Sequence, residues 1–134
     1  MRLVDAYEHP VATALLYSLL EERDEGVNIS HREMPNAEQH AAFLRSRPYA
    51  HWYLIEADEA CVGAIYLTRQ DEIGIFILKG QQGHGYGRAA VELLMKVHAR
   101  PRFLANINPA NTRSIGFFQR LGFRHIQNTY ELRP

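Results

Sequence analysis

Three glycines stand between a short apolar run and a strongly periodic helix. The run covers Glu72–Leu78, the helix is expected from about Gly85 to Ala99, and the loop that joins them reads Gln82-Gly83-His84-Gly85-Tyr86-Gly87-Arg88. Glycine lets a backbone approach a ligand closely. The first N–H groups of a helix have no internal partners, and the helix dipole gives that end a positive potential. The sequence therefore predicts a phosphate-binding strand–loop–helix unit.

Three types of phosphate-binding loop combine glycines with a helix start. A P-loop ends in Gly-Lys followed by Ser or Thr, which this chain lacks. A dinucleotide loop needs Gly-x-Gly-x-x-Gly and an acidic residue about twenty positions later. Here the spacing is Gly83-x-Gly85-x-Gly87, and the chain reads Asn106-Ile107-Asn108 around position 107. Both of these loop types are excluded. A third type of loop remains, with a simple strand-to-helix turn that binds no phosphate as the alternative to it.

The third type of loop binds acetyl-CoA. Residues 82–87 match the Gln/Arg-x-x-Gly-x-Gly/Ala pattern of the GNAT superfamily of N-acetyltransferases at every defined position. Residues 111–123 resemble the second signature of that family: an Asn that opens a helix (Asn111), a small residue three positions later (Ser114), an aromatic pair and a closing Leu-Gly-Phe. The order and separation of the two stretches also match. The resemblance is firm from about Glu72 onward and rests on element order before it.

The expected elements alternate between strands and helices. Strands are expected at residues 2–7, 50–56, 61–69, 72–78, 103–107, 123–126 and 129–132. Helices are expected after Pro10, ending near Gly26 and Asn28, and after Met34-Pro35-Asn36, Gly85 and Asn111. Residues 72–107 should form a right-handed crossover between parallel strands. We expect an α/β fold with a mixed, mostly antiparallel central sheet flanked by helices, the GNAT-like acyl-CoA-binding fold.

Composition narrows the class of protein. With 134 residues, one domain spanning 1–134 is expected. Fifteen basic and fifteen acidic residues cancel, so nucleic acid and anionic membranes are not expected partners. The apolar run Val11–Leu20 is too short to cross a bilayer and follows acidic residues, unlike a signal peptide. Cys61 stands alone in an apolar run, which predicts a buried thiol and no metal site. A cytoplasmic monomer or homodimer is expected.

The resemblance implies acetyl-CoA as co-substrate and assigns its binding to residue positions. The pantetheine arm would bind the backbone of the strand before the loop, and the pyrophosphate would lie on loop N–H groups. The positions are Ile75, Phe76, Ile77, Gln82, Gly83, His84, Gly85, Tyr86, Gly87, Arg88, Asn111, Ser114 and Phe118. His84 and Arg88 are equally interpretable as solvated loop residues, and Asn111 as a plain helix cap. Arg113 and Arg120 are candidates for the 3′-phosphate of CoA.

Catalysis in this family is direct attack by an amine on a thioester, which needs a base and an acid. Glu72 starts the strand that would pass the thioester and is the candidate base; a solvent-facing strand end is the alternative. Ribosomal-protein acetyltransferases carry a glutamate five residues before the motif Asn, where this chain has Asn106. The family often protonates the thiolate with a Tyr at the position of Phe118, so the acid stays unassigned.

The predicted function is transfer of acetyl from acetyl-CoA to the amine of a small molecule. The acceptor pocket has as candidates His31, His51, Trp52, Tyr53 and Tyr130, each of which is also interpretable as core or surface. A protein acetyltransferase and a regulatory acyl-CoA-binding domain without turnover are the alternatives. The sequence does not identify the acceptor.

Overall fold

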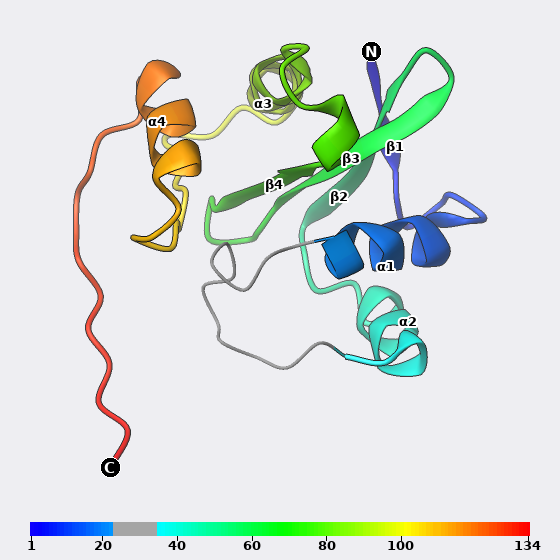
Figure 1. The fold of residues 1–134 in the computed structure, drawn as a ribbon, viewed down its shortest axis with the longest axis horizontal. Helices are drawn as coiled ribbons and strands as arrows, with labels where there is room; N and C mark the ends of the chain where they lie inside the picture. The colour runs from blue at the N-terminus through cyan, green and yellow to red at the C-terminus, as the bar shows by residue number, and fades with distance from the viewer. Residues whose placement is uncertain (23–34) are drawn as a thin grey trace.

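A single antiparallel sheet forms the centre of the molecule (Figure 1). The computed structural model describes residues 1–22 and 35–134. The strands are β1 (Arg2–Asp5), β2 (His51–Ala57), β3 (Ala60–Leu67) and β4 (Ile73–Ile77), in that order across the sheet. The helices are α1 (Ala12–Glu22), α2 (Ala37–Arg45), α3 (Tyr86–Val97) and α4 (Thr112–Arg120), with the 3-10 turn η2 (Lys79–Gln81) after β4. The expected α/β class, with an antiparallel sheet flanked by helices, is confirmed.

Tight turns fix the register of the sheet. The β2–β3 hairpin turns at Asp58 and Glu59, whose φ angles are 51° and 64°. Two residues with positive φ form the type of turn whose twist matches antiparallel strands. The β3–β4 connection turns at Asp71, with φ 69°, and the Glu72 N–H donates to Thr68 Oγ1 across it. Both turns lie in the gaps that the expected strands leave, at residues 57–60 and 70–71.

The two faces of the sheet carry separate cores because successive side chains of a strand point to opposite sides. One face packs Ile55, Ile65 and Leu67 against α3. The other face packs Trp52 and Leu54 against α1 and α2. Figure 1 shows α3 on one side of the sheet and the pair α1 and α2 on the other.

The strand expected at residues 103–107 is reduced to one bridge. Leu104 lies parallel to Glu72, its C=O accepts from the Ile73 N–H and its N–H donates to the Asp71 C=O, both at 2.8 Å. The parallel orientation expected for the two ends of residues 72–107 is therefore confirmed. The prediction of a full strand is wrong because the two segments share no ladder beyond this bridge.

The two strands expected at residues 123–126 and 129–132 are also wrong. Residues 124–134 leave the end of α4 as an exposed extension that runs away from the body of the molecule (Figure 1). Their alternation of apolar and polar residues suits a strand, but the described part of the chain offers them no strand partner.

Helix starts agree well with the sequence. Asn36 caps α2 in a capping box: its Oδ1 accepts from the Gln39 N–H at 2.8 Å, and the Gln39 Oε1 accepts from the Asn36 N–H at 2.9 Å. The end expected for the first helix, at Gly26 and Asn28, lies outside the described residues, as does Met34. Within residues 1–22 and 35–134, no helix has the length and apolar character needed to span a membrane.

A pair of stacked histidines joins β2 to the end of α3. The His51 and His98 rings lie 3.6 Å apart, and the Tyr53 hydroxyl oxygen is 2.6 Å from His98 Nε2. Burial lowers the pKa of both histidines below the usual 6.5, and the Arg100 charge lowers each further. Both rings are therefore neutral in the folded protein near pH 7, and Tyr53 can donate to His98.

Acid should destabilise the protein through this pair. Because the folded pKa values are lowered, the unfolded chain binds more protons, so the free energy of unfolding should fall as the pH drops below 6.5. Urea unfolding at several pH values measures this. His98→Gln, which keeps a partner for Tyr53, should flatten the dependence, whereas His125→Gln at an exposed site should not. An equal slope in both variants would contradict the assignment.

Candidate active site

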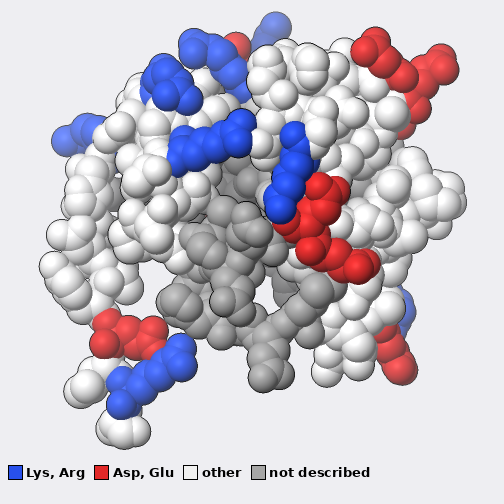
Figure 2. Space-filling model, viewed as in Figure 1, with Lys and Arg blue, Asp and Glu red and all other residues white. Residues whose placement is uncertain are grey.

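A cavity of about 1010 Å³ runs from the glycine loop to the helices on the opposite face of the sheet. β4, the glycine loop and α4 line one half of the cavity. α1, α2 and the aromatic side chains of the sheet line the other half. Figure 2 shows Lys and Arg side chains gathered over α3 and α4. Arg88, Arg113 and Arg120 line the cavity from these two helices. A cavity with one basic end and one aromatic end suits an elongated anionic ligand that meets a second molecule.

The glycine loop leaves the start of α3 open to this cavity. Gly83 and Gly85 have φ angles of 87° and 77°, and a Cβ added at either position would meet nothing within 4 Å. Glycine is therefore needed there for its backbone angle, while the space beside it stays free. Gly85 caps the helix without a side-chain hydrogen bond. The N–H groups of the first helical residues, Tyr86–Arg88, have no acceptor among the described residues, as a phosphate site requires.

Two further positions of the motif have structural roles. The Gln82 side-chain amide donates to the Ile77 C=O at 3.2 Å and ties the loop to the end of β4. A Cβ at Gly87 would lie 3.2 Å from the Phe117 ring, so glycine there lets α3 and α4 pack closely. His84 tilts against the Tyr86 ring and does not line the cavity.

β4 presents its outer edge to the cavity. The Ile73 N–H bonds outward to Leu104, whereas the Leu78 N–H bonds inward to β3, so the odd residues of β4 carry the outward main-chain groups. Ile75 and Ile77 hold such positions, and the Ile77 C=O is taken by Gln82. Phe76 turns its main chain toward β3, opposite Ala64, unlike the outward role expected for it. Ile75 is thus left as the position best suited to pair with a bound amide.

Asn111 caps the other helix that reaches the cavity. Its Oδ1 accepts from the Ser114 N–H at 3.2 Å, and its Nδ2 donates to Ser114 Oγ at 3.1 Å. Phe118 is 5% exposed, and its ring packs edge-on against Phe117 and Phe123, each at 5.1 Å. The cap role weighed for Asn111 is therefore present, and all three predicted positions on α4 line the cavity.

Glu72 is held in place by two neighbours. One carboxylate oxygen accepts from Thr68 Oγ1 at 3.1 Å, and the other accepts from the Asn106 side-chain amide. Asn106 and Ile73 line the cavity, and Glu72 is not among its lining residues. The carboxylate is thus held by two hydrogen bonds while Glu72 stays partly exposed, and Asn106 connects it to the lining of the cavity.

The second half of the cavity is a stack of aromatic rings. Tyr49 and Tyr66 lie parallel with centroids 3.8 Å apart, and Trp52 meets the Tyr49 ring edge-on at 4.8 Å. The Tyr66 ring covers Gly74 so closely that a Cβ there would lie 2.0 Å from it. The rings therefore form a continuous wall from β2 to β4.

His40 completes this wall and was missed from the sequence. It packs edge-on against Tyr17 and Trp52, is 6% exposed, and burial lowers its pKa. Among the described residues its Nδ1 is a buried polar atom without a hydrogen-bond partner. Tyr66 was missed as well, although it pairs directly with Trp52 across β2 and β3. The two-residue turn between β2 and β3 fixes this pairing. The sequence could therefore have shown that Tyr66 lies beside Trp52.

The residues expected to line an acceptor pocket are divided by the structure. Trp52 lines the cavity. His51 and Tyr53 lie on the opposite face, beside His98, and Tyr130 is 88% exposed on the C-terminal extension. His31 lies outside the described residues. The prediction is therefore wrong for His51, Tyr53 and Tyr130.

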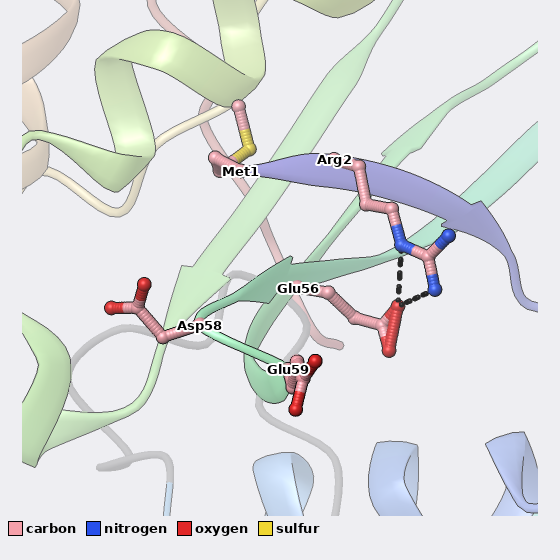
Figure 3. A pocket seen from close by; sticks show the side chains of 5 residues that line it. All are labelled: Met1, Arg2, Glu56, Asp58 and Glu59. Carbon is pink, nitrogen blue, oxygen red and sulfur yellow. Dashed lines mark hydrogen bonds and ion pairs between the residues drawn. The ribbon is translucent and has the colours of Figure 1, made fainter.

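Two other features carry no catalytic chemistry. A second hollow, beside Met1 at the far end of the sheet, is lined by Arg2, Glu56, Asp58 and Glu59 (Figure 3). Arg2 and Glu56 pair with each other at 3.0 Å, and the remaining lining residues are an apolar side chain and two exposed carboxylates. Burial raises the pKa of the Cys61 thiol, which donates to the Gly63 C=O at 3.4 Å. A protonated thiol is a poor nucleophile.

Comparison with known proteins identifies the family. The chain has the fold and the loop of an acyl-CoA-dependent transferase, and residues 11–123 match the family model described as acetyltransferase (GNAT) family. The chain belongs to that family.

Among individual proteins, peptidyl-lysine N-acetyltransferase YjaB of Salmonella typhimurium is 29% identical over 82 residues, which are 61% of this chain and 54% of that protein. The match thus covers about half the length of this relative. An acetyltransferase from Thermus thermophilus superposes with a TM-score of 0.76 at 23% identity, over 95% of this chain and 88% of that one. The structure of YncA from Salmonella typhimurium with its cofactor acetyl-CoA superposes with a TM-score of 0.65 at 17% identity, over 91% of this chain and 77% of that one. The structural matches show a shared fold.

Removing the α4 cap should cost stability. Asn111→Ala loses both hydrogen bonds to Ser114 and should lower the free energy of unfolding by about 1 kcal/mol. Asn111→Asp keeps an acceptor for the Ser114 N–H and should lose much less. Urea unfolding of the three proteins measures the difference, and equal losses in both variants would mean that the cap contributes little.

Proposed function

We propose that this protein transfers the acetyl group of acetyl-CoA to an aliphatic primary amine. The proposal rests on one observation: unpartnered N–H groups at the start of α3, the outward main chain of β4 and an aromatic wall all face one cavity. Membership of the GNAT acetyltransferase family supports it.

Acetyl-CoA fits the first half of the cavity by its chemistry. The pyrophosphate would accept hydrogen bonds from the N–H groups of Tyr86–Arg88, where the helix dipole favours negative charge. The amides of the pantetheine arm would pair with the outward main chain of Ile75. Arg113 and Arg120 supply positive charge for the remaining phosphate. The structure of YncA contains acetyl-CoA, and that supports the same cofactor here.

The reaction forms a bond between the amine nitrogen and the acetyl carbon and breaks the carbon–sulfur bond. The nitrogen must first lose a proton, and the departing sulfur gains one. Glu72 is the proposed base, acting through a water or through movement of Asn106, because Asn106 lines the cavity and donates a hydrogen bond to the Glu72 carboxylate. Phe118 cannot donate a proton, so the thiolate takes one from solvent.

The aromatic half of the cavity suits an amine on an apolar stem. Tyr49, Trp52 and Tyr66 offer ring surfaces that pack against methylene groups, and a ring face attracts a cationic amine before it is deprotonated. His40 offers its ring to a polar group of the acceptor. A small aliphatic amine is the first candidate acceptor.

A lysine side chain of a protein is the second candidate. It carries the same primary amine on the same kind of stem, and the YjaB relative is named a peptidyl-lysine N-acetyltransferase.

Turnover with a panel of acceptors tests the proposal. Release of CoA thiol should depend on an added amine, and mass spectrometry should show the product heavier by one acetyl group. The panel should hold small aliphatic amines and lysine-containing peptides at matched concentrations. Binding of acetyl-CoA without amine-dependent release would leave the regulatory acyl-CoA-binding domain as the function.

The glycine loop should control acetyl-CoA affinity. Gly85→Glu places a negative charge and a strained backbone where the pyrophosphate would bind, and calorimetry should show a large loss of affinity. Gly85→Ala adds the backbone strain alone, and Gly80→Glu adds the same charge on the exposed turn before the loop. Gly80→Glu should bind normally. Unchanged affinity in Gly85→Glu would remove the basis of the proposal.

Glu72 should affect turnover rather than affinity. Glu72→Gln removes the proposed base, so kcat should fall at neutral pH while the acetyl-CoA Kd stays near its original value. A higher pH leaves more of the amine neutral and should partly restore the rate. Thr68→Val removes one hydrogen bond to the carboxylate and the acceptor of two main-chain N–H groups of the turn, so it tests how far the rate depends on the position of Glu72. Equal rates for Glu72→Gln and the parent protein across the pH range would assign Glu72 to structure alone.

A further inference from the structure

His40 places a polar ring on the buried side of α2. His40 and Leu44 are one helical turn apart and are the two buried residues that this helix contributes. Leu44 belongs to the apolar core of this face of the sheet. His40 is 6% exposed, and its Nδ1 has no hydrogen-bond partner among the described residues. A buried polar atom without a partner costs stability, so one that a folded protein keeps calls for an explanation.

The neighbours of His40 offer it ring edges rather than polar groups. The Tyr17 ring of α1 and the Trp52 ring of β2 meet it edge-on, with centroids 5.6 Å and 6.4 Å away. The Tyr17 hydroxyl donates to the Pro35 C=O at 3.0 Å and is thus directed to another partner. His40 nevertheless lines the cavity. The described neighbours therefore leave Nδ1 unused, on a residue that a molecule bound in the cavity would contact.

The His40 ring is uncharged near pH 7, because burial lowers its pKa below the usual 6.5. A neutral imidazole donates through one nitrogen and accepts through the other. A hydroxyl or an amide also both donates and accepts, so either group can match either nitrogen. A charged group would lose its hydration among the aromatic rings, and a neutral imidazole supplies no opposite charge to offset that loss. The group that suits this ring is therefore an uncharged hydroxyl or amide.

Three residues in a row connect β4 with His40. Gly74 of β4 pairs with Tyr66 of β3, and Tyr66 pairs with Trp52 of β2, so the three positions lie side by side on one face of the sheet. The row spans two strand spacings, about 10 Å. All three residues line the cavity, and the Trp52 ring contacts His40 at the far end of the row. A ligand that begins beside β4 and follows the row reaches His40 with an extended stem.

We propose that His40 selects the acceptor and favours a primary amine whose apolar stem ends in an uncharged hydroxyl or amide. The inference rests on the proposed function, because it names the class of amine that the acetyl transfer uses. The amine lies beside β4, the stem lies along Tyr66 and Trp52, and the terminal group hydrogen-bonds to the His40 ring. An amine without this group displaces water from the cavity and gives the ring no partner in return, so it binds less well.

Two kinds of acceptor carry this chemistry. A small amino alcohol or amino amide holds both groups in one molecule. A lysine residue holds them as well, because its main-chain amide lies at the opposite end of the side-chain stem from the amine. Acceptors from both sources therefore belong in the test.

Matched pairs of acceptors test the selection in the full chain, with saturating acetyl-CoA and release of CoA thiol as the signal. One series pairs each amino alcohol with the alkylamine that carries a methyl group in place of the hydroxyl, over a range of stem lengths. A second series compares N-acetyl-lysine methylamide with the alkylamine of equal stem length. In at least one series, kcat/KM should be about five- to tenfold higher for the acceptor with the polar group, as one hydrogen bond between uncharged partners predicts. The series with the larger ratio identifies the source.

Variants on α2 assign this preference to the His40 ring. His40→Phe keeps an aromatic side chain without a hydrogen-bonding group, so the ratio should fall to about one. His40→Gln keeps a donor and an acceptor and should retain part of the preference. Phe43→Leu is the control: it changes an apolar lining residue of the same helix and should alter both members of a pair alike.

The outcomes separate this inference from the proposed function. No preference in the parent protein, or an unchanged preference in His40→Phe, would overturn the selection by His40 while leaving the acetyl transfer in place. Absence of thiol release with every amine would contradict the proposed function, on which the inference depends.

Urea unfolding distinguishes selection of a ligand from a structural role of the ring. His40→Phe removes an unpaired polar atom from the free protein, so the free energy of unfolding should stay the same or rise. A fall in His40→Phe that His40→Gln reverses would show that the polar ring stabilises the fold, and the inference would then be wrong. If the larger Phe side chain prevents folding, His40→Leu takes its place in both measurements.

Discussion

The two hydrogen bonds of Leu104 hold two parallel segments together at one point, and the cavity opens from there. Beyond the bridge β4 continues to the glycine loop, while the other segment runs to the start of α4. Ile75 and Ile107 face the cavity from these two sides. A continuous ladder would use the outward main chain of Ile75 and close the space between them. The missing ladder is therefore what makes room for a ligand.

The helices are arranged around that opening. Ala90, Val91 and Leu94 bury α3 against the sheet, which fixes the first turn of the helix at the end of β4. Gly87 lets α4 approach, so that two helix N-termini meet at one cavity. On the other face, the aromatic wall continues the cavity toward α1 and α2. The packing of the helices on the sheet thus places the basic end and the aromatic end in one cavity.

Sequence reasoning succeeded where the structural cause is local. The helix starts near Asn36 and Gly85, the cap considered at Asn111 and the breaks between β2, β3 and β4 each depend on a few neighbouring residues. Sequence reasoning failed where the conformation depends on a pairing partner that is distant in the sequence. The alternation in residues 124–132 is that of a strand, but a strand needs an edge to pair with, and the local sequence does not show whether one is within reach.

The aromatic half of the cavity was hard to predict for a related reason. His51, Trp52 and Tyr53 are consecutive, and alternation sends Trp52 to one face and its neighbours to the other. The sequence shows that consecutive residues alternate between the two faces of the sheet, but not which of the two faces borders the cavity. His40 reaches the cavity only because α2 packs over Trp52, which is a tertiary contact.

The contact between Tyr66 and Gly74 joins two positions into one steric unit. A methyl group at 74 would fall inside the volume of the ring, so the sizes of these two residues cannot vary independently. A change that shortens Tyr66 to admit a bulkier acceptor also frees position 74 to carry a side chain. Variants that admit other acceptors should therefore carry substitutions at both positions. A scan of single substitutions would underestimate the range of acceptors that this fold can take.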